Sequence, residues 1–234
     1  MPGTRQPSAR KLTSRKATVP GATTPGRSPG RDPVRTRARI LAAAEREFST
    51  RGYAGAKLEA IARRAKVTKG LVFHYFRSKQ ALYTAAMEQI YQQLRQRQNE
   101  TALAGLAPEA GIRRLAIDTF RSFREAPEIV AMMNEENLHR AHHIAGSALI
   151  PALYNPLINE ITRLLAEGEA TGIFRTGVDP VAFYIALSGL GYFYCSNRYT
   201  LGTVFRCDLF EPGRVAVYET QIADMAVAYL AAHS

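Results

Sequence analysis

The sequence predicts an all-α protein, and three observations predict this class. From Pro33 onward, apolar residues recur every three or four positions, which is the period of one buried helix face. No segment shows the strict apolar–polar alternation of a half-buried strand. Pro, Gly and N-capping residues stand where such helices would begin and end. We therefore expect a three-helix N-terminal domain followed by a larger helical domain.

Residues 1–32, before the first helix, are rich in Pro, Gly, Ser, Thr and Arg and contain few apolar side chains. Such a composition cannot bury enough surface to offset the entropy lost on ordering, so we expect a disordered basic N-terminal arm. The arm serves either as a solubilising tail or as a source of sequence-independent attraction to phosphates. Both interpretations remain open.

The positive charge of the chain, net +11, is concentrated near its N-terminus. Residues 1–32 carry seven Lys or Arg and one acid, residues 33–80 carry twelve and three, and residues 81–234 carry twelve and sixteen. This asymmetry indicates a polyanionic partner for the first third.

Cysteine count and hydropathy exclude two other classes of protein. Two cysteines are too few for a disulfide scaffold. The longest nearly apolar run, Phe183–Cys195, is shorter than the roughly 20 residues that span a bilayer. The N-terminus lacks the apolar core of a signal peptide. We therefore expect a cytoplasmic protein with no membrane partner.

The first helices form a compact series with clear start and stop residues. Asp32 and Pro33 suit a helix start, and Gly52 suits a helix end. The expected elements are helices at about 33–51 and 58–65, a turn at 66–67, a helix at 68–75 capped by Thr68, and a long helix from Lys79 capped by Ser78. Two short helices joined by a turn of three or four residues predict a helix-turn-helix, whose second helix enters the major groove of DNA.

Five longer helices are expected after it. They run from about Glu109 to Arg124, from Pro127 to about His143, through Pro151 and Pro156 to Ala170 with a stop at Gly172, from Asp179-Pro180 to about Arg198, and from Glu211-Pro212 to about Ala231.

The helix-turn-helix carries side chains suited to DNA. Thr68 and Lys69 lie in the first turn of the second helix, where free N–H groups and the helix dipole favour phosphate. Gly70 has no side chain, so a backbone or a base edge can approach closely. His74, Tyr75 and Lys79 offer polar groups to neighbouring phosphates near and beyond the end of the helix.

Residues 35–87 resemble the N-terminal domain of the tetracycline-repressor (TetR) family of transcriptional regulators. The resemblance rests on an ordered series of motifs: TRARILAAAEREFSTRGY, then LEAIARRAKVTKGLVFHYFRSKQALYTAAM. It implies that Thr68, Lys69, Gly70 and Leu71 line the recognition helix. It also implies phosphate contacts, which would come from Arg35, Arg37, Lys57, His74, Tyr75 and Lys79.

Two positions depart from the pattern of that family. The cap of the second helix is usually Ser or Thr, and here Ala56-Lys57 stands there, which weakens the cap by about 1 kcal/mol. The turn usually holds Gly and here holds Lys66, which costs roughly 1 kcal/mol if its backbone is left-handed. Both changes add positive charge near the expected DNA.

The resemblance implies that the remainder of the chain dimerises through its last two helices, about 180–198 and 212–231, and binds a small-molecule effector. Residues 181–202 are apolar almost all round, with small residues between aromatic ones. A helix of this kind is buried on every face, either against a second copy of the chain or within its own subunit.

This part of the sequence contains candidate residues for an effector pocket and for a metal site. The candidate pocket residues, which could equally be ordinary core, are Phe120, Phe123, Met133, Asn134 and Asn137. Glu135, His139 and His143 would share one face of a continuous helix and could hold a divalent metal, or could mark an exposed helix end. We expect neither a metal nor another cofactor.

These observations predict a DNA-binding transcriptional regulator divided into residues 1–32, 33–80 and 81–234. By resemblance, it would repress from a double-stranded operator as a homodimer until an unidentified effector releases it; activation in place of repression also remains open. Two alternatives remain. The first is an enzyme, for which no nucleotide-binding, hydrolase or zinc-protease motif is present. The second is a non-specific nucleic-acid-coating protein that relies on the basic arm.

Overall fold

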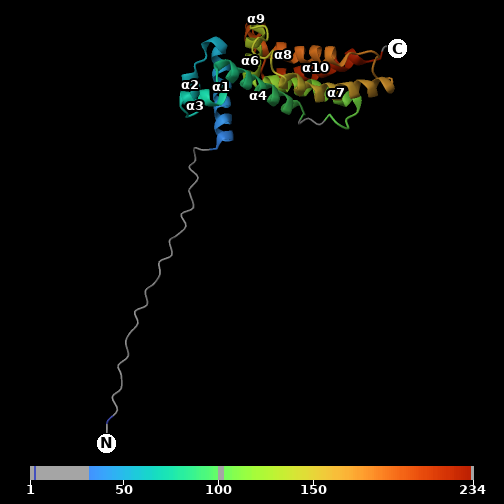
Figure 1. Cartoon of the computed structure of the whole chain (residues 1–234). Helices are drawn as coiled ribbons and strands as arrows, with labels where there is room; N and C mark the ends of the chain where they lie inside the picture. The colour runs from blue at the N-terminus through green and yellow to red at the C-terminus, as the bar shows by residue number, and fades with distance from the viewer. Residues whose placement is uncertain (1–2, 4–31, 100–102, 233–234) are drawn as a thin grey trace. The chain divides into compact units, whose positions relative to one another are not determined.

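The computed structural model describes residues 3, 32–99 and 103–232, and this part of the chain contains ten helices and no strand longer than one isolated bridge (Figure 1). The predicted all-α class is confirmed. The predicted N-terminal arm lies almost wholly outside the described residues. From Pro33 onward the chain forms one compact unit, so the division near residue 80 remains a prediction.

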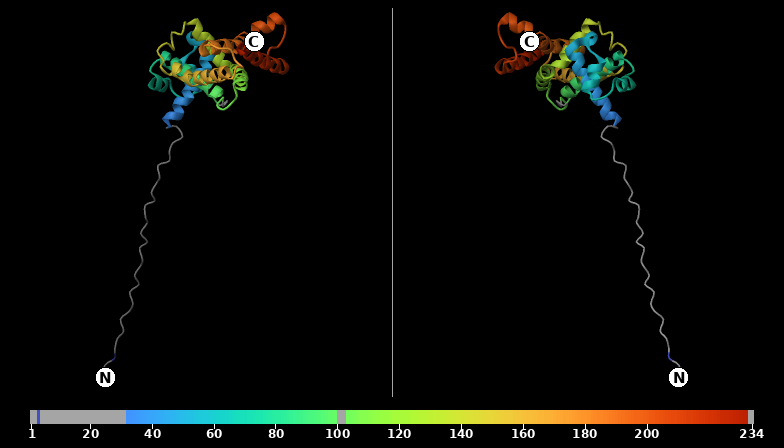
Figure 2. Two further views of the ribbon diagram at one scale, coloured as in Figure 1. Left: turned by 90° about the vertical axis from the view of Figure 1, so that its right-hand side faces the viewer. Right: turned by 90° about the vertical axis from the view of Figure 1, so that its left-hand side faces the viewer.

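The helix bounds agree with most of the predicted elements. They are α1 Pro33–Gly55, α2 Leu58–Arg64, α3 Lys69–Phe76, α4 Lys79–Asn99, α5 Pro108–Arg124, α6 Pro127–Leu138, α7 Leu149–Ala170, α8 Pro180–Ser196, α9 Arg198–Phe205 and α10 Pro212–Leu230. The helices α1, α2 and α3 lie together at the end of this unit opposite the C-terminus (Figure 1). Figure 2 shows the unit from each of these two ends.

The three N-terminal helices enclose a small apolar core. Ile40 and Phe48 of α1, Ile61 of α2, and Val72 and Phe76 of α3 are at most 5% exposed. Helical geometry in α1 is interrupted at Gly52, where φ is 66° and ψ is 176°. Glycine adopts a positive φ without steric cost, so the predicted stop at this residue is confirmed.

The long helix α4 connects this core to the rest of the unit without an intervening loop. Ser78 Oγ accepts the N–H of Ala81 at 3.0 Å, which confirms the predicted cap. Leu82 and Ile90, two turns apart on one face, are fully buried. Contacts with α1, α5 and α7 hold α4 in place.

Helix α5 is the centre of the larger part. It packs against α8 and α10, and nine of its seventeen residues are buried, including Ile112, Leu115 and Phe120. A Cβ built on Gly168 of α7 would lie 2.0 Å from a ring carbon of Phe174. The absence of a side chain at Gly168 is therefore what lets Phe174 pack there.

The predicted C-terminal end of α6 is wrong, and with the observed end the three residues considered as metal ligands no longer share one helix. Helix α6 ends at Leu138 rather than near His143, because Arg140 and Ala141 both take positive φ, at 55° and 58°. The Glu136 carboxylate accepts the N–H of His143 at 2.8 Å in the resulting turn.

Glu135, His139 and His143 consequently do not lie at successive turns of one helix. Within the described residues, no group of three or more Cys, His, Asp or Glu side chains is placed to hold a metal ion.

The segment after α8 also differs from the prediction. The expected helix to about Arg198 ends at Ser196, and a separate short helix, α9, follows it. The predicted start of the last helix is confirmed, because Glu211 caps α10 through the N–H groups of Gly213 and Arg214, both at 2.9 Å. No described helix combines the length and the apolarity that crossing a bilayer would require.

Candidate DNA interface

Arg39 of α1 holds the turn between α2 and α3 through side-chain hydrogen bonds. Lys66 has φ of 53°, so the left-handed conformation considered from the sequence is present. Arg39 donates from Nε and Nη2 to the Ala65 carbonyl, at 3.1 and 2.5 Å, and from Nη2 to the Lys66 carbonyl at 3.2 Å. These bonds fix the angle between α2 and α3 from outside the motif itself. The sequence pattern gave no signal for this role of Arg39.

The first turn of α3 is exposed and capped as predicted. Thr68 Oγ1 accepts the N–H of Leu71 at 3.2 Å. The nearest described atom to a Cβ built on Gly70 is Thr68 Oγ1, at 3.9 Å, so nothing within the described chain requires glycine here. An exposed helical glycine without an internal steric reason is consistent with close approach by a partner. Leu71 is half-buried, and its neighbour Val72 anchors the helix in the core.

Lys69 lies on the same exposed surface but is engaged with an acid of α2. Its Nζ donates to Glu59 Oε1 at 2.6 Å, and both side chains are more than half exposed. The hydrogen bond from Lys69 lowers the pKa of the Glu59 carboxyl below its usual value. Because the pair is exposed, water and salt screen it, and its ammonium can exchange to a phosphate or base at little cost.

The residues expected to contact phosphates surround α3. His74 is exposed and packs edge-to-face on Tyr75, with ring centroids 5.5 Å apart. Lys79 donates to the Ala54 carbonyl at 3.3 Å and lies 5.0 Å above the Tyr53 ring. Lys79 therefore also ties the start of α4 to the end of α1, a structural role that the sequence did not indicate.

The other predicted phosphate ligands lie on α1 and at the start of α2. Arg35 and Arg37 are exposed in the first two turns of α1, and the guanidinium of Arg37 lies 5.2 Å above the Phe76 ring. Lys57 is the N-cap residue of α2, and its side chain caps no described N–H group, as expected from the sequence. The Lys57 N–H reaches Glu47 Oε1 at 3.4 Å instead.

Three further arginines extend the positive surface beyond the predicted set. A recess of about 480 Å³ between α1 and α2 is lined by Lys57 together with Arg51, Arg63 and Arg64. One carboxylate, Glu47, lies in this recess and approaches Arg64 at 3.6 Å. Charge density alone could have indicated these arginines, since all of them lie within residues 33–80.

The five candidate effector residues do not meet around one cavity. Phe123 and Asn134 line a cavity of about 170 Å³, and Asn134 is hydrogen-bonded to the Tyr192 hydroxyl. Phe120 is fully buried and packs edge-to-face against aromatic rings of α8 and α10. Met133 is half-buried and Asn137 is exposed, and neither is among the residues lining that cavity.

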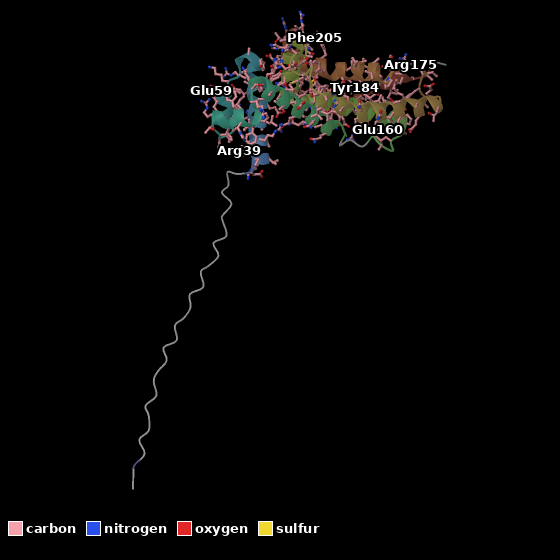
Figure 3. All side chains as sticks on the ribbon, viewed as in Figure 1. Arg39, Glu59, Glu160, Arg175, Tyr184 and Phe205 are labelled. Atoms are coloured by element: carbon pink, nitrogen blue, oxygen red, sulfur yellow. The ribbon has the colours of Figure 1, made fainter. Side chains whose placement is uncertain are left out.

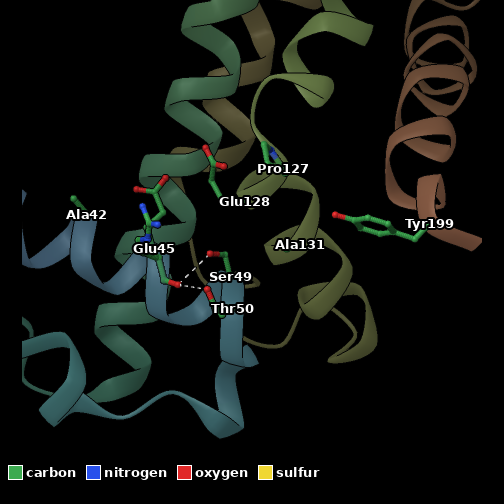
Figure 4. A pocket seen from close by; sticks show the side chains of 9 residues that line it. Ala42, Glu45, Ser49, Thr50, Pro127, Glu128, Ala131 and Tyr199 are labelled. Atoms are coloured by element: carbon green, nitrogen blue, oxygen red, sulfur yellow. Dashed lines mark hydrogen bonds between the residues drawn. The ribbon is translucent and has the colours of Figure 1, made fainter. Parts of the chain in front are cut away.

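A larger recess of about 670 Å³ lies between α1 and α6 and reaches Tyr199 of α9 (Figure 4). Its lining includes the carboxyls of Glu45 and Glu128. Burial raises the pKa of Glu45, while a hydrogen bond from Gln89 acts in the opposite direction. This recess is wide open to solvent, so a small molecule bound there would stay largely exposed, unlike in the enclosed pockets that bind most ligands.

Helix α6 also touches the N-terminal helices directly. The N–H of Tyr53 donates to Glu135 Oε1 at 2.8 Å, and the Tyr53 ring packs on His143 with centroids 4.1 Å apart. The end of α1 is therefore connected to the turn after α6.

Helix α3 is short and exposed, crosses α2 after a turn held by Arg39, and is surrounded by cations. This arrangement defines a DNA-binding regulator of the helix-turn-helix class. Comparison with known proteins identifies its family. Residues 40–86 match the family model described as "Bacterial regulatory proteins, tetR family", and residues 108–226 match "Tetracyclin repressor-like, C-terminal domain". The chain belongs to the TetR family and is a DNA-binding transcriptional regulator.

Individual relatives agree with this assignment. The transcriptional repressor NicS of Pseudomonas putida is 32% identical over 193 residues, which cover 82% of this chain and 91% of NicS. The repressor SCO4008 of Streptomyces coelicolor is 41% identical over 58 residues, 25% of this chain and 30% of that protein. The crystal structure of SCO4942 from Streptomyces coelicolor has a TM-score of 0.63 at 24% identity, covering 81% of this chain and 97% of that chain, and supports the fold.

Proposed function

We propose that the protein is a homodimeric repressor that binds a double-stranded operator through α3 and leaves it when a small molecule binds the larger helical part. The observation that carries this proposal is the exposed first turn of α3, with Thr68, Lys69 and Gly70 facing away from the core. Leu71 would complete the base-reading surface, and Arg35, Arg37, Lys57, His74, Tyr75 and Lys79 would position the duplex through its phosphates.

Dimerisation follows from the limited reach of a single short helix, which reads few base pairs and needs a second half-site about one DNA turn away. Helices α8 and α10 supply a fitting surface. Ile185 and Phe193 of α8 are 65% and 59% exposed, and Val217 of α10 is 67% exposed. These apolar side chains support a symmetric interface between α8 and α10 of two copies, because isolated subunits seldom leave such a set in water.

Release would follow from differential binding between two dimer geometries. An effector that binds better to the arrangement in which the two α3 helices are mis-spaced draws the population away from the DNA-bound form. Helix α4 and the contact between Glu135 and Tyr53 offer routes from the larger part to the motif. The proposal places this action in the cytoplasm and assigns the protein no catalytic step.

The direct test is a gel-shift and footprinting screen of DNA fragments from the promoter beside its own gene. A discrete protected site of two half-sites, with affinity that falls steeply as salt rises, is the expected result. Deleting residues 1–32 separates a repressor from a coating protein, because a repressor keeps its preferred site without the arm. Absence of any preferred site in the screen would count against the proposal.

The dimer has its own test. Replacing Ile185 by Glu should shift the protein to a monomer in light scattering and lower its operator affinity, since a single α3 then reads one half-site. The matched substitution Val204→Glu alters an equally exposed apolar residue of α9 and should leave the dimer intact. A dimer that survives Ile185→Glu would place the interface elsewhere.

A further inference from the structure

The interior of the larger part contains a buried arginine with incomplete hydrogen bonding. Arg95 of α4 is 2% exposed, and its Nε and Nη1 have no hydrogen-bond partner among the described residues. None of the ion pairs in the described part of the chain includes Arg95. A buried guanidinium without a carboxylate is costly, so its unused donors mark a candidate site for an anionic ligand.

Aromatic rings and neutral polar groups surround the guanidinium. Its central carbon lies 4.2 Å from the Tyr154 ring and 5.5 Å from the Tyr184 ring, and Nη2 donates to the Tyr184 hydroxyl at 2.7 Å. That hydroxyl donates to Gln98 Oε1 at 3.4 Å. The Tyr91 ring packs against that of Tyr154, with the two ring centroids 6.1 Å apart. Figure 3 places Tyr184 in the larger helical part, away from the helix-turn-helix.

The cluster carries a net positive charge at neutral pH. Burial raises the pKa of both Tyr91 and Tyr154, so these hydroxyls stay neutral. Glu136, an acid whose charge acts on Tyr91, is committed elsewhere, because its carboxylate accepts the N–H groups of His143 and Ile144 at 2.8 and 3.2 Å. The charge of Arg95 is therefore not neutralised within the cluster.

The unused donors fit a carboxylate. A guanidinium presents two edges that can each bind both oxygens of a carboxylate, and each edge uses one hydrogen of Nη2. Tyr184 occupies one hydrogen of Nη2, so one complete edge remains for a second acceptor. Ser188, one turn after Tyr184 on α8, has a buried hydroxyl that also lacks a partner among the described residues. The rings of Tyr154 and Tyr184 lie against the guanidinium and would contact the apolar part of a small organic acid.

We propose that Arg95, together with Tyr91, Tyr154 and Tyr184, binds the carboxylate group of a small organic acid, and that this acid is the effector. Its role as effector rests on the proposed function, whereas binding does not. Arg95 lies sixteen residues after Lys79 on the same helix, about 24 Å along it at the usual helical rise. A ligand that draws α4, α7 and α8 together at Arg95 therefore acts on the helix that begins at the DNA-binding motif.

The test compares acids with neutral analogues of the same shape. Benzoate, phenylacetate, hexanoate and octanoate are each assayed beside their primary amides, by thermal shift and by quenching of tyrosine emission in this Trp-free chain. The expected result is a rise in melting temperature with at least one acid and none with its amide, since a ligand at 100 times its Kd adds a readily measured stabilisation. No shift with any of the four acids, or equal shifts with acid and amide, would overturn the proposal.

Variants assign the binding to Arg95. Arg95→Met keeps the volume, removes the charge and should weaken acid binding about 100-fold while leaving the unliganded protein folded. Arg97→Met, on the same helix but exposed, is the control and should bind the acid as the parent does. If Arg95→Met does not fold, Tyr154→Phe and Arg95→Lys take its place, and unchanged affinity in both would refute the assignment.

Separate measurements distinguish this proposal from the proposed function. Acid binding is measured without DNA, and operator binding is measured without acid. Arg95→Met should bind the operator normally and should no longer be released by the acid. An acid that binds at Arg95 but leaves the operator complex unchanged would refute the effector role alone.

Discussion

Replacing Gly70 by Ala should separate the stability of α3 from its contact with DNA. Gly70 is the second residue of a regular helix, exposed, and a Cβ built there meets nothing closer than Thr68 Oγ1 at 3.9 Å. Ala is favoured over Gly in a helix by roughly 0.5–1 kcal/mol, so the free energy of unfolding should rise by that amount. For a chain of this size, the melting temperature should rise by about 1–4 °C.

The same methyl group should weaken operator binding. If a base edge or phosphate contacts the backbone at Gly70, the added Cβ displaces it, and loss of one such contact costs about 1–3 kcal/mol, or roughly 5- to 150-fold in affinity. Fluorescence anisotropy with a labelled operator at fixed salt measures this, and Gly146→Ala, which also has open space around its Cβ, serves as the control. A more stable variant with unchanged operator affinity would refute close approach at Gly70. A Gly70→Ala variant with a lower free energy of unfolding than the parent would refute the conclusion that Gly70 lies in a regular helix with open space around its Cβ.

Three further predictions test other features. Lys66→Gly should raise the free energy of unfolding by up to about 1 kcal/mol, because φ at this residue is 53°. It should also reduce the salt dependence of operator binding by the equivalent of about one charged contact to phosphate. A lower urea midpoint for the variant would contradict the first expectation. Gly168→Ala should lower stability by about 1–3 kcal/mol through the clash with Phe174, and equal urea midpoints would show that the ring can move. Burial raises the pKa of the Cys195 thiol to about 12, so iodoacetamide at pH 8 should label half-buried Cys207 and spare Cys195 until the chain is unfolded. Raising the pH to 9 should still leave Cys195 unlabelled, and rapid labelling of the folded protein at both cysteines would contradict this.

Features set by local chemistry were predictable from the sequence. The caps at Thr68, Ser78 and Glu211, and the break at Gly52, depend on groups within a few residues of one another, so the sequence alone indicates them. The left-handed turn at Lys66 could be predicted only from the resemblance to the TetR family, whose turn usually holds Gly, because lysine itself does not favour a positive φ.

Features that depend on distant partners were not predictable. Arg39 clamps a turn 26 residues away, and Lys69 meets Glu59 only after α2 and α3 cross. The end of α6 was misplaced because the turn after it is stabilised by the Glu136 carboxylate rather than by Gly or Pro. The environment of Arg95 is assembled from α4, α7 and α8, so no local pattern marks it as different from a surface arginine.

The continuous helix α4 limits how this protein can be recombined with its relatives. A join placed within α4 falls inside regular helix, so every residue added or removed there rotates whatever follows by about 100° and shifts it by about 1.5 Å. A chimera that carries another regulator's recognition domain should therefore work only when the spliced helix keeps its phase, with three or four extra residues tolerated better than two. Any exchange of parts made within α4 therefore depends on angular register.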